Sequence, residues 1–436
     1  MMNPEFRRNL WLSFSTHRLI AMPALTGLAF LALAMSDIND TAKTMYTAAS
    51  ALFIFIVWLW GTSNANSAIV DELRDRTWDQ QRMSSLSPWS MTWGKLFGAT
   101  SFNWYGGLLC LMVAALSGIA AQQPAWPVDL LSLVAGAVML HAGIIALNLH
   151  TGQLGMRVIQ RGGLGWLAIV FVLFTLPAFS SRDGNITWWS TEIDSKLFIL
   201  VSVLFFAACA VFAAWRVVCN ALQVRTLPWA WPLFACVLSL YLAGFFVIAS
   251  TRPLFTLHSV ALSIAAVMTY AALFTEQTGI LTWKKLRLRQ RAADWRGWLE
   301  HLPLWPTTLL LTFVFALFST LAQPDDAASR PDYIALFAAP LCLALMVLRD
   351  AAVVLFFAFA RNNRRALGAA MLYLLVINVL LPFFANVAGL PLLGYLFLPF
   401  SDQYPAVTSI FVMACHAAIA LALVIWRVRE TERSQA

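Results

Sequence analysis

Residues 67–98 read SAIVDELRDRTWDQQRMSSLSPWSMTWGKLFG, a mixed polar and charged block between two long apolar runs. The rest of the chain is very different, since 60% of its 436 residues are hydrophobic and only 11% are charged. Residues 69–73 continue the preceding apolar pattern as a helix. Ser87-Pro88 is expected to stop a helix, because proline lacks an amide hydrogen and restricts the residue before it. The block therefore predicts a helix–break–helix elbow outside the membrane, with a plain solvated loop as the alternative.

The composition around this elbow is that of a membrane protein. The mean hydropathy is +0.73, and the chain contains 31 Phe and 19 Trp. A helix of about 20 apolar residues crosses about 30 Å of hydrocarbon. On this criterion we predict an all-α polytopic membrane protein with twelve transmembrane helices, at 17–35, 45–66, 96–120, 128–149, 164–180, 196–219, 228–249, 256–276, 305–322, 332–349, 367–388 and 405–427.

The distribution of charge predicts the orientation of these spans. With both termini in the cytoplasm, nearly all of the 29 Lys and Arg residues lie inside, as the positive-inside rule requires. The exceptions are Lys43, Arg182, Lys196, Arg252 and Arg330. The net charge of +8 thus reflects topology and anionic lipid headgroups, and we expect no nucleic-acid partner.

The spans repeat along the chain. Span starts recur after about 207 residues, and internal repeats of this kind are common in transporters. We predict two pseudo-symmetric six-helix halves, 1–222 and 223–436. The long cytoplasmic loops, 67–95 and 277–304, occupy the same place in each half, whereas the join is short. Major-facilitator transporters instead carry their long loop at the join, together with a G-x-x-x-D-R-x-G-R-R-like motif that this chain lacks.

Before the first span, Asn3-Pro4-Glu5 is typical of a helix start, with an N-cap, a proline in the first turn and a favourably placed acid. We expect a short helix on the cytoplasmic surface; the alternative is the frayed start of the first span. None of the six cysteines forms a C-x-x-C pair, so we expect neither a disulfide framework nor a metal site.

Ionisable residues inside spans usually mark ion pathways, and they are scarce here. Arg349 and Asp350 are placed at the end of a span, where they are expected to pair, and no carboxylate is predicted in the middle of one. The uncharged polar candidates within the spans either hydrogen-bond between helices or line a substrate pathway. They are Asn103, Asn148, Asn378 and Asn386.

At the elbow the sequence resembles the membrane subunit of a type-II ABC exporter. Members of this superfamily carry an acidic residue after their second span, then Gly-Thr, a Leu- and Ser-rich stretch with proline, and Gly-Lys opening the third span. The matching residues here are Glu72, Thr77, Leu86, Ser87, Pro88, Gly94 and Lys95. Arg76 stands in place of the glycine. It follows Glu72 by four residues, a spacing that suits a helical ion pair between the two.

The second half matches this pattern less well. Glu276, Thr278 and Gly279 replace the acid and the Gly-Thr in scrambled order, and a basic run that includes Arg289 and Arg291 follows. These basic residues could bind an ATPase, bind anionic lipid or simply fix the orientation of the spans. The resemblance also implies short re-entrant segments at 181–195 and 387–404.

The resemblance implies that the elbow is a coupling helix docked on a separate cytoplasmic ABC ATPase, in two copies. The chain has no G-x-x-x-x-G-K-[ST] motif, so ATP and Mg²⁺ would be held by that partner and this chain is not expected to be an enzyme or to hold a cofactor. The implied role is export of an amphipathic or lipidic substrate across a bacterial inner membrane, in contact with lipids and possible accessory subunits. The rivals are an ion-gradient-driven transporter and a non-transporting scaffold or assembly factor.

Overall fold

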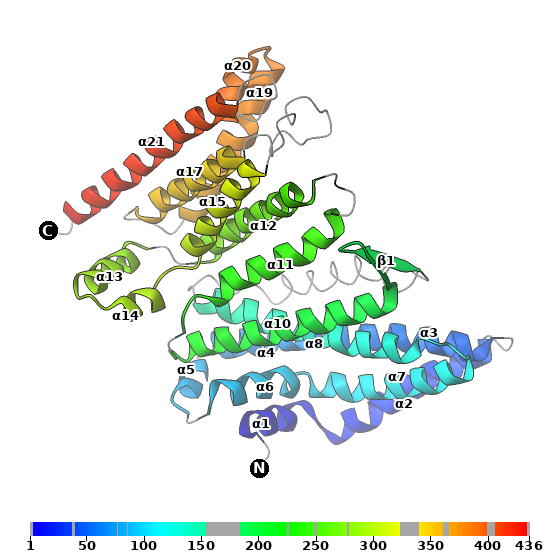
Figure 1. Cartoon of the computed structure of the whole chain (residues 1–436). Helices are drawn as coiled ribbons and strands as arrows, with labels where there is room; N and C mark the ends of the chain where they lie inside the picture. Colours follow the sequence, from blue (N-terminus) through cyan, green and yellow to red (C-terminus); the bar gives the residue numbers. More distant parts are fainter. Residues whose placement is uncertain are drawn as a thin grey trace. The chain divides into compact units, whose positions relative to one another are not determined.

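The computed structural model (Figure 1) describes residues 3–36, 40–75, 77–84, 86–153, 184–224, 226–247, 250, 252–276, 279–322, 340–360, 366–398 and 406–433. The predicted span 164–180 lies outside these residues, as do Arg76, Arg182, Thr278 and Arg330.

The protein is an all-α polytopic membrane protein with one small β-hairpin, as the sequence predicts for its fold class. Among the described residues, nine helices are long and apolar enough to cross a membrane. They are Thr16–Met35, Thr41–Arg74, Ser101–Ala120, Trp126–His150, Ser195–Ala221, Pro253–Thr275, Pro340–Ala358, Ala366–Val387 and Val407–Thr431. Two shorter apolar helices, Ala230–Phe246 and Trp305–Leu321, occupy two further predicted spans.

The chain divides into two compact units, which we describe separately. Unit 1 comprises Met1–Ile186 and Glu192–Thr226, and unit 2 comprises Thr187–Thr191 and Leu227–Ala436. The hairpin lies at this division and consists of β1 (Asn185–Trp188) and β2 (Thr191–Asp194). Trp189 and Ser190 between the strands both have positive φ angles, which suits a tight hairpin turn. The re-entrant helix expected within 181–195 is therefore wrong for residues 185–194.

Unit 1 is built on a long second span that changes its helical pitch midway. Its elements are α1 (Pro4–Ser13), α2 (Thr16–Ser36), α3 (Thr41–Phe53), the π-helix η1 (Ile54–Gly61), α4 (Thr62–Arg74), α5 (Thr77–Arg82), α6 (Pro88–Gly98), α7 (Ser101–Ala120), α8 (Trp126–Gln153) and α10 (Ser195–Ala221). Helices α3, η1 and α4 run on without a break, so the second span extends well beyond a bilayer thickness and delivers the elbow. Phe53, Val57 and Trp58 on this span form the centre of the apolar core.

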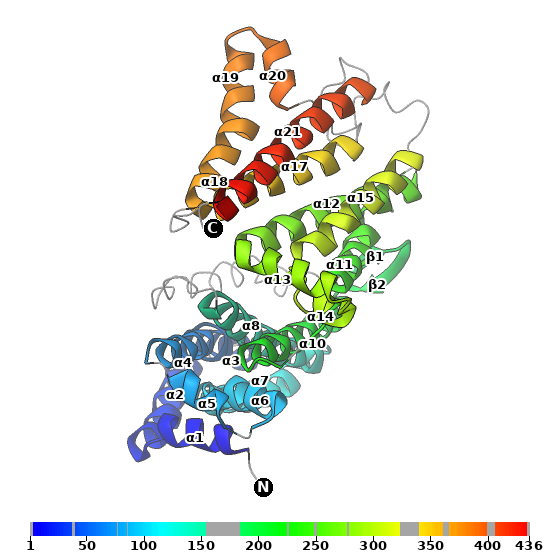
Figure 2. The same ribbon diagram turned by 90° about the vertical axis from the view of Figure 1, so that its left-hand side faces the viewer.

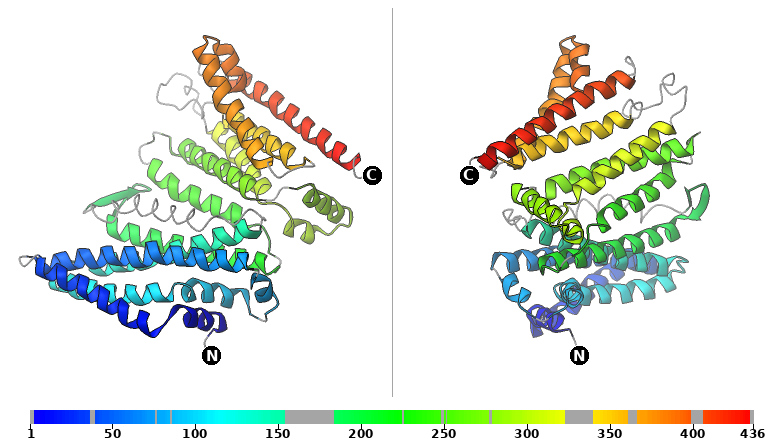
Figure 3. Two further views of the ribbon diagram at one scale, coloured as in Figure 1. Left: turned by 180° about the vertical axis from the view of Figure 1, so that it is seen from behind. Right: turned by 60° about the vertical axis from the view of Figure 1, so that its left-hand side comes forward.

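Unit 2 packs its spans through small residues. Its elements are α11 (Ala230–Phe246), α12 (Pro253–Thr275), α13 (Ile280–Arg291), α14 (Trp295–Glu300), α15 (Trp305–Leu321), α17 (Pro340–Ala358), α18 (Ala366–Leu375), the π-helix η3 (Val376–Leu380), α19 (Leu381–Val387), α20 (Pro391–Phe397) and α21 (Ala406–Arg433). Buried Ala266, Ala351 and Ala352 allow the close approach of helices that is typical of membrane bundles. Helix α21 (red in Figure 3) lies along α17, and α20 folds back beside α19 (Figure 2).

The predicted end of one span is wrong. The prediction placed a span at 332–349, but α17 continues through Arg349 and Asp350 to Ala358. The charged pair interrupts the apolar run without ending it, because residues 351–360 (AAVVLFFAFA) are apolar again. The two opposite charges neutralise each other, which permits the helix to bury them and continue.

Candidate functional site

Helix α1 is a separate helix that packs against the second arm of the elbow. Its N-cap is Asn3, whose side chain accepts a hydrogen bond from the Glu5 amide, and Pro4 is in its first turn. The face of α1 with the buried Glu5 and Asn9 packs on α6. Trp11, on the other side, is exposed. The polar face of α1 therefore points into the protein.

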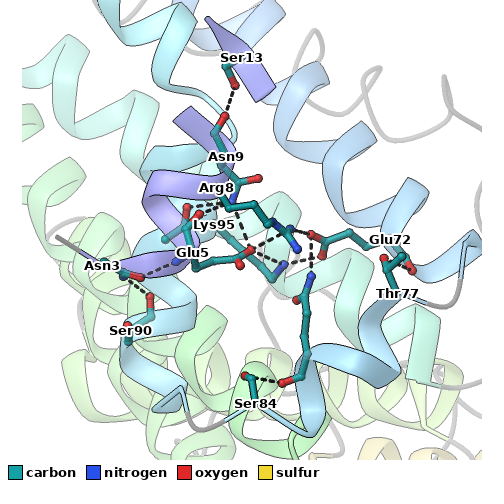
Figure 4. A network of polar contacts seen from close by, with 12 residues as sticks. Asn3, Glu5, Arg8, Asn9, Ser13, Glu72, Thr77, Ser84, Ser90 and Lys95 are labelled. Atoms are coloured by element: carbon teal, nitrogen blue, oxygen red, sulfur yellow. Dashed lines mark hydrogen bonds and ion pairs between the residues drawn. The ribbon is translucent and has the colours of Figure 1, made fainter. Parts of the chain in front are cut away.

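The buried polar face of α1 takes part in an ionic network with the elbow (Figure 4). We name this network the elbow clamp; it consists of Glu5, Arg8, Glu72, Gln81 and Lys95. Lys95 Nζ lies 3.2 Å from Glu5 Oε1 and also pairs with Glu72. Arg8 Nη2 lies 3.0 Å from Glu5 Oε1 and pairs with Glu72 as well. Gln81 Nε2 donates to Glu72 Oε1 at 3.0 Å.

The elbow clamp is balanced in charge, and the pair of Lys95 and Glu5 within it is shielded from solvent, whereas Arg8 is 41% exposed. Two carboxylates face two cations, and the side chains of Lys95 and Glu5 are only 3% and 4% exposed. Buried charges are tolerated when they are paired and hydrogen-bonded in this way. The predicted coupling residues Glu72 and Lys95 thus hold the elbow to α1. The sequence reasoning missed Glu5, Arg8 and Gln81 as members, although the three-residue spacing of Glu5 and Arg8 puts them on neighbouring turns of one helix.

Two other motif residues shape the same contact. A Cβ atom at Gly94 would lie 2.6 Å from Glu5 Cβ, so only glycine allows α1 to approach α6 this closely. Ser87 and Pro88 do not end a helix, as the sequence suggested, but begin one. Ser87 Oγ accepts from the Ser90 amide at 3.2 Å, and Pro88 is the first residue of α6. Proline is well placed there because the first turn of a helix needs no amide donor.

The remaining motif residues complete the elbow. Thr77 begins α5 and its hydroxyl donates to the Glu72 carbonyl at 3.3 Å. Leu86 packs against the apolar cluster under the elbow. Arg76, the predicted ion-pair partner of Glu72, lies outside the described residues.

An exposed surface remains at the end of the elbow. We name it the elbow tip; its members are Gln80, Met83, Ser84, Ser87 and Trp89, all exposed. Met83 is 83% exposed and Trp89 is 45% exposed, so apolar side chains of the elbow tip are accessible. The charged motif residues Glu72 and Lys95 therefore hold the elbow against α1, while the elbow tip stays exposed.

The second long loop is built differently. Glu276 at the end of α12 accepts hydrogen bonds from the Leu304 amide at 2.8 and 2.9 Å and from the Trp305 amide at 3.4 Å, which caps the start of α15. Burial raises the pKa of Glu276 to about 7, although these hydrogen bonds oppose the shift. Arg289 pairs with Asp294 at 3.0 Å, and Arg291 is exposed on α13. The structure does not bring Glu276 together with these two arginines in any hydrogen bond or ion pair among the described residues.

In unit 1 two buried polar side chains, Asn103 and His141, contact backbone carbonyls of the π-helix η1. A π-helix departs from the usual bonding pattern and leaves backbone groups that need other partners. Asn103 Nδ2 donates to the Ile56 carbonyl at 2.9 Å, and His141 Nε2 lies 2.9 Å from the Val57 carbonyl. Asn148 donates to the Asn66 side chain at 3.0 Å. Asn103 and Asn148 therefore hydrogen-bond between segments of unit 1, the first of the two roles considered for them.

In unit 2 a charged pair lies in the middle of a candidate span, contrary to the prediction that no such carboxylate exists. Arg349 and Asp350, 3% and 1% exposed, are the only buried Asp, Glu, Lys or Arg side chains in the described candidate spans. Arg349 Nη2 lies 2.7 Å from Asp350 Oδ1. Asn378 on η3 and Tyr270 on α12 both donate to Asp350 Oδ2, at 2.9 and 2.7 Å. Asn386 is exposed near Gly394 and is not part of this cluster.

Among the described residues no group of three or more His, Cys, Asp or Glu side chains could hold a metal ion. Comparison of the chain with known protein families, curated proteins and solved structures finds no match in any of the three.

Proposed function

We propose that this protein is the permease subunit of an ATP-driven exporter of the type-II ABC class, with the elbow tip as the docking surface for a separate ATPase. The supporting observation is the combination of a fixed elbow and an outward-facing tip. Helix α5 and helix α6 join the elbow tip to α4 and α7, and the elbow clamp ties this assembly to α1. A push on the elbow tip would thus move the second and third spans together.

The finer parts of this proposal follow the resemblance of the elbow motif. The chain would form two six-span halves, 1–222 and 223–436, with both termini in the cytoplasm of a bacterial inner membrane. Two ATPase copies would supply the energy, with ATP and Mg²⁺ bound in them. The substrate would be an amphipathic or lipidic molecule. The two halves would engage their ATPases differently, because in the described part of the second loop Glu276 caps the start of α15, whereas Glu72 pairs with Lys95 and Arg8.

The proposal is tested by purifying the tagged full chain from native membranes, identifying any ABC ATPase that co-purifies with it and measuring ATP hydrolysis of the complex. Met83→Asp places a charge on the elbow tip without touching the elbow clamp, and we expect loss of both ATPase binding and stimulation. The matched control is Val224→Asp, at an exposed apolar residue on the same predicted side of the membrane. If hydrolysis remains coupled in Met83→Asp and in Trp89→Asp, the elbow tip is not the docking surface.

A second candidate function, ion-gradient-driven transport, is favoured by one observation. Asp350 is a buried carboxylate in the middle of a candidate span, where proton- and ion-coupled transporters place theirs. This alternative predicts uptake into vesicles that contain no ATPase, driven by an imposed proton or sodium gradient. Asp350→Asn would abolish that uptake.

A further inference from the structure

The charged pair of unit 2 joins four elements. Arg349 and Asp350 belong to α17, and their hydrogen-bond partners come from α12, η3 and α20. A pair of charges in a membrane bundle is costly to bury, and apolar residues of similar size often serve packing equally well. The position therefore calls for a role beyond packing.

The hydrogen bonds of Asp350 are complete. Oδ1 accepts from Arg349 Nε at 2.8 Å and pairs with Nη2 at 2.7 Å. Oδ2 accepts from Asn378 and Tyr270. With this many donors, the carboxylate is held in place even if the guanidinium changes its other partners.

The Arg349 guanidinium is hydrogen-bonded less strongly through the edge formed by Nη1 and Nη2 than through the edge that faces Asp350. Asp350 occupies the edge formed by Nε and Nη2. On the other edge, Nη2 donates to Asn378 Oδ1, and Nη1 has a long contact of 3.4 Å with the Phe397 carbonyl. Two neutral oxygens thus accept from Nη1 and Nη2, the two nitrogens that a carboxylate or phosphate binds together in the fork arrangement.

The two neutral oxygens belong to a π-helix and to the end of a short α-helix. Asn378 lies on the five-residue π-helix η3, and Phe397 is the last residue of α20, which has only seven residues. Leu398 after it already has non-helical backbone angles. Around this pair of elements, exposed apolar side chains offer a surface for a hydrocarbon chain; they include Phe383, Phe384, Leu392 and Leu396.

We propose that Arg349 is the headgroup site for an anionic amphiphile, whose carboxylate or phosphate oxygens replace Asn378 Oδ1 and the Phe397 carbonyl. The tail would lie along the apolar side of α19 and α20. This inference names the substrate class of the proposed exporter and to that extent rests on the proposed function.

The test measures binding in the absence of any ATPase. The full chain is placed in phosphatidylcholine nanodiscs, and equilibrium binding of radiolabelled laurate and dodecyl phosphate is compared with that of uncharged methyl laurate. The double variant Arg349→Gln/Asp350→Asn removes both charges together, so that no unpaired charge stays buried. We expect it to bind laurate at least about tenfold more weakly, because the charge-assisted fork is lost.

Two further variants make the result decisive. Arg216→Gln, at a half-buried arginine in the α10 span of unit 1, is expected to bind laurate like the wild type. Arg349→Lys keeps Asp350 neutralised but lacks the planar fork, and it covers the case in which the double variant does not fold. It is expected to weaken dodecyl phosphate binding by roughly tenfold while methyl laurate binding is unchanged.

Several outcomes would overturn the inference. One is equal binding of laurate and methyl laurate, and another is wild-type laurate binding by both Arg349 variants. Displacement of dodecyl phosphate by an equal concentration of inorganic phosphate would show a site for free anions instead. In contrast, competition by phosphatidylglycerol added to the nanodiscs would support the inference and would identify a membrane lipid as the amphiphile. Because no ATPase is present, failure here is distinguishable from failure of the elbow-tip experiment.

Discussion

Replacing Lys95 with methionine tests the physical basis of the elbow clamp. Lys95 is the cation shared by Glu5 and Glu72, and Glu5 is almost fully buried. Removing one partner of a buried ion pair costs about 3–5 kcal/mol, because the other charge is left unpaired. Arg8 still reaches both carboxylates, so the lower end of that range, about 3 kcal/mol, is expected. Methionine keeps most of the apolar stem, which limits the loss of packing.

The assay is amide hydrogen exchange in α1, together with thermal unfolding of the full chain in detergent. A loss of about 3 kcal/mol corresponds to a roughly hundredfold faster opening of α1. The control is Arg74→Met, which removes an exposed pair: Arg74 and Asp71 are 51% and 36% exposed and 4.0 Å apart. Such a pair contributes about 0–1 kcal/mol. If Lys95→Met accelerates exchange in α1 no more than Arg74→Met does, the elbow clamp does not hold the helix.

Three further predictions concern single sites. Gly61→Ala places a Cβ 2.7 Å from His141 Nε2 and is expected to destabilise by about 1–3 kcal/mol, whereas Gly143→Ala, with no atom within 4 Å, is expected to be neutral or stabilising in thermal unfolding. Because burial raises the pKa of Glu276 to about 7, its contribution to stability is complete below its ordinary pKa of 4.5 and is lost as the pH rises through about 7. Melting temperatures of the wild type should therefore fall between pH 5 and pH 8 relative to those of Glu276→Gln, and parallel curves would contradict this. Ser87→Ala removes the N-cap of α6 and should lower the free energy of unfolding by about 1 kcal/mol in chemical denaturation. An unchanged free energy would show that the cap does not stabilise α6.

The elbow shows how far local pattern can be taken. The helical continuation of the second span and the start of α1 at Asn3 are local features, and the sequence predicts both. The role of Ser87-Pro88 was predicted wrongly, because proline both disfavours helix before it and suits the first turn of a helix after it. Which effect applies depends on where the following residues pack, and here α6 is held against α1.

Hydropathy is sufficient to predict an all-α multi-pass membrane protein, because each span must satisfy its backbone within its own consecutive residues. The partners of the polar residues, in contrast, follow from how the helices pack. Glu5 meets Lys95 across 90 positions, and Tyr270 meets Asp350 across 80. Such pairings arise from helix docking, and neither spacing nor composition contains that information. The burial of Arg349 depends on them too, since its charge is tolerated in the bundle only beside the carboxylate and the amide that the fold brings to it.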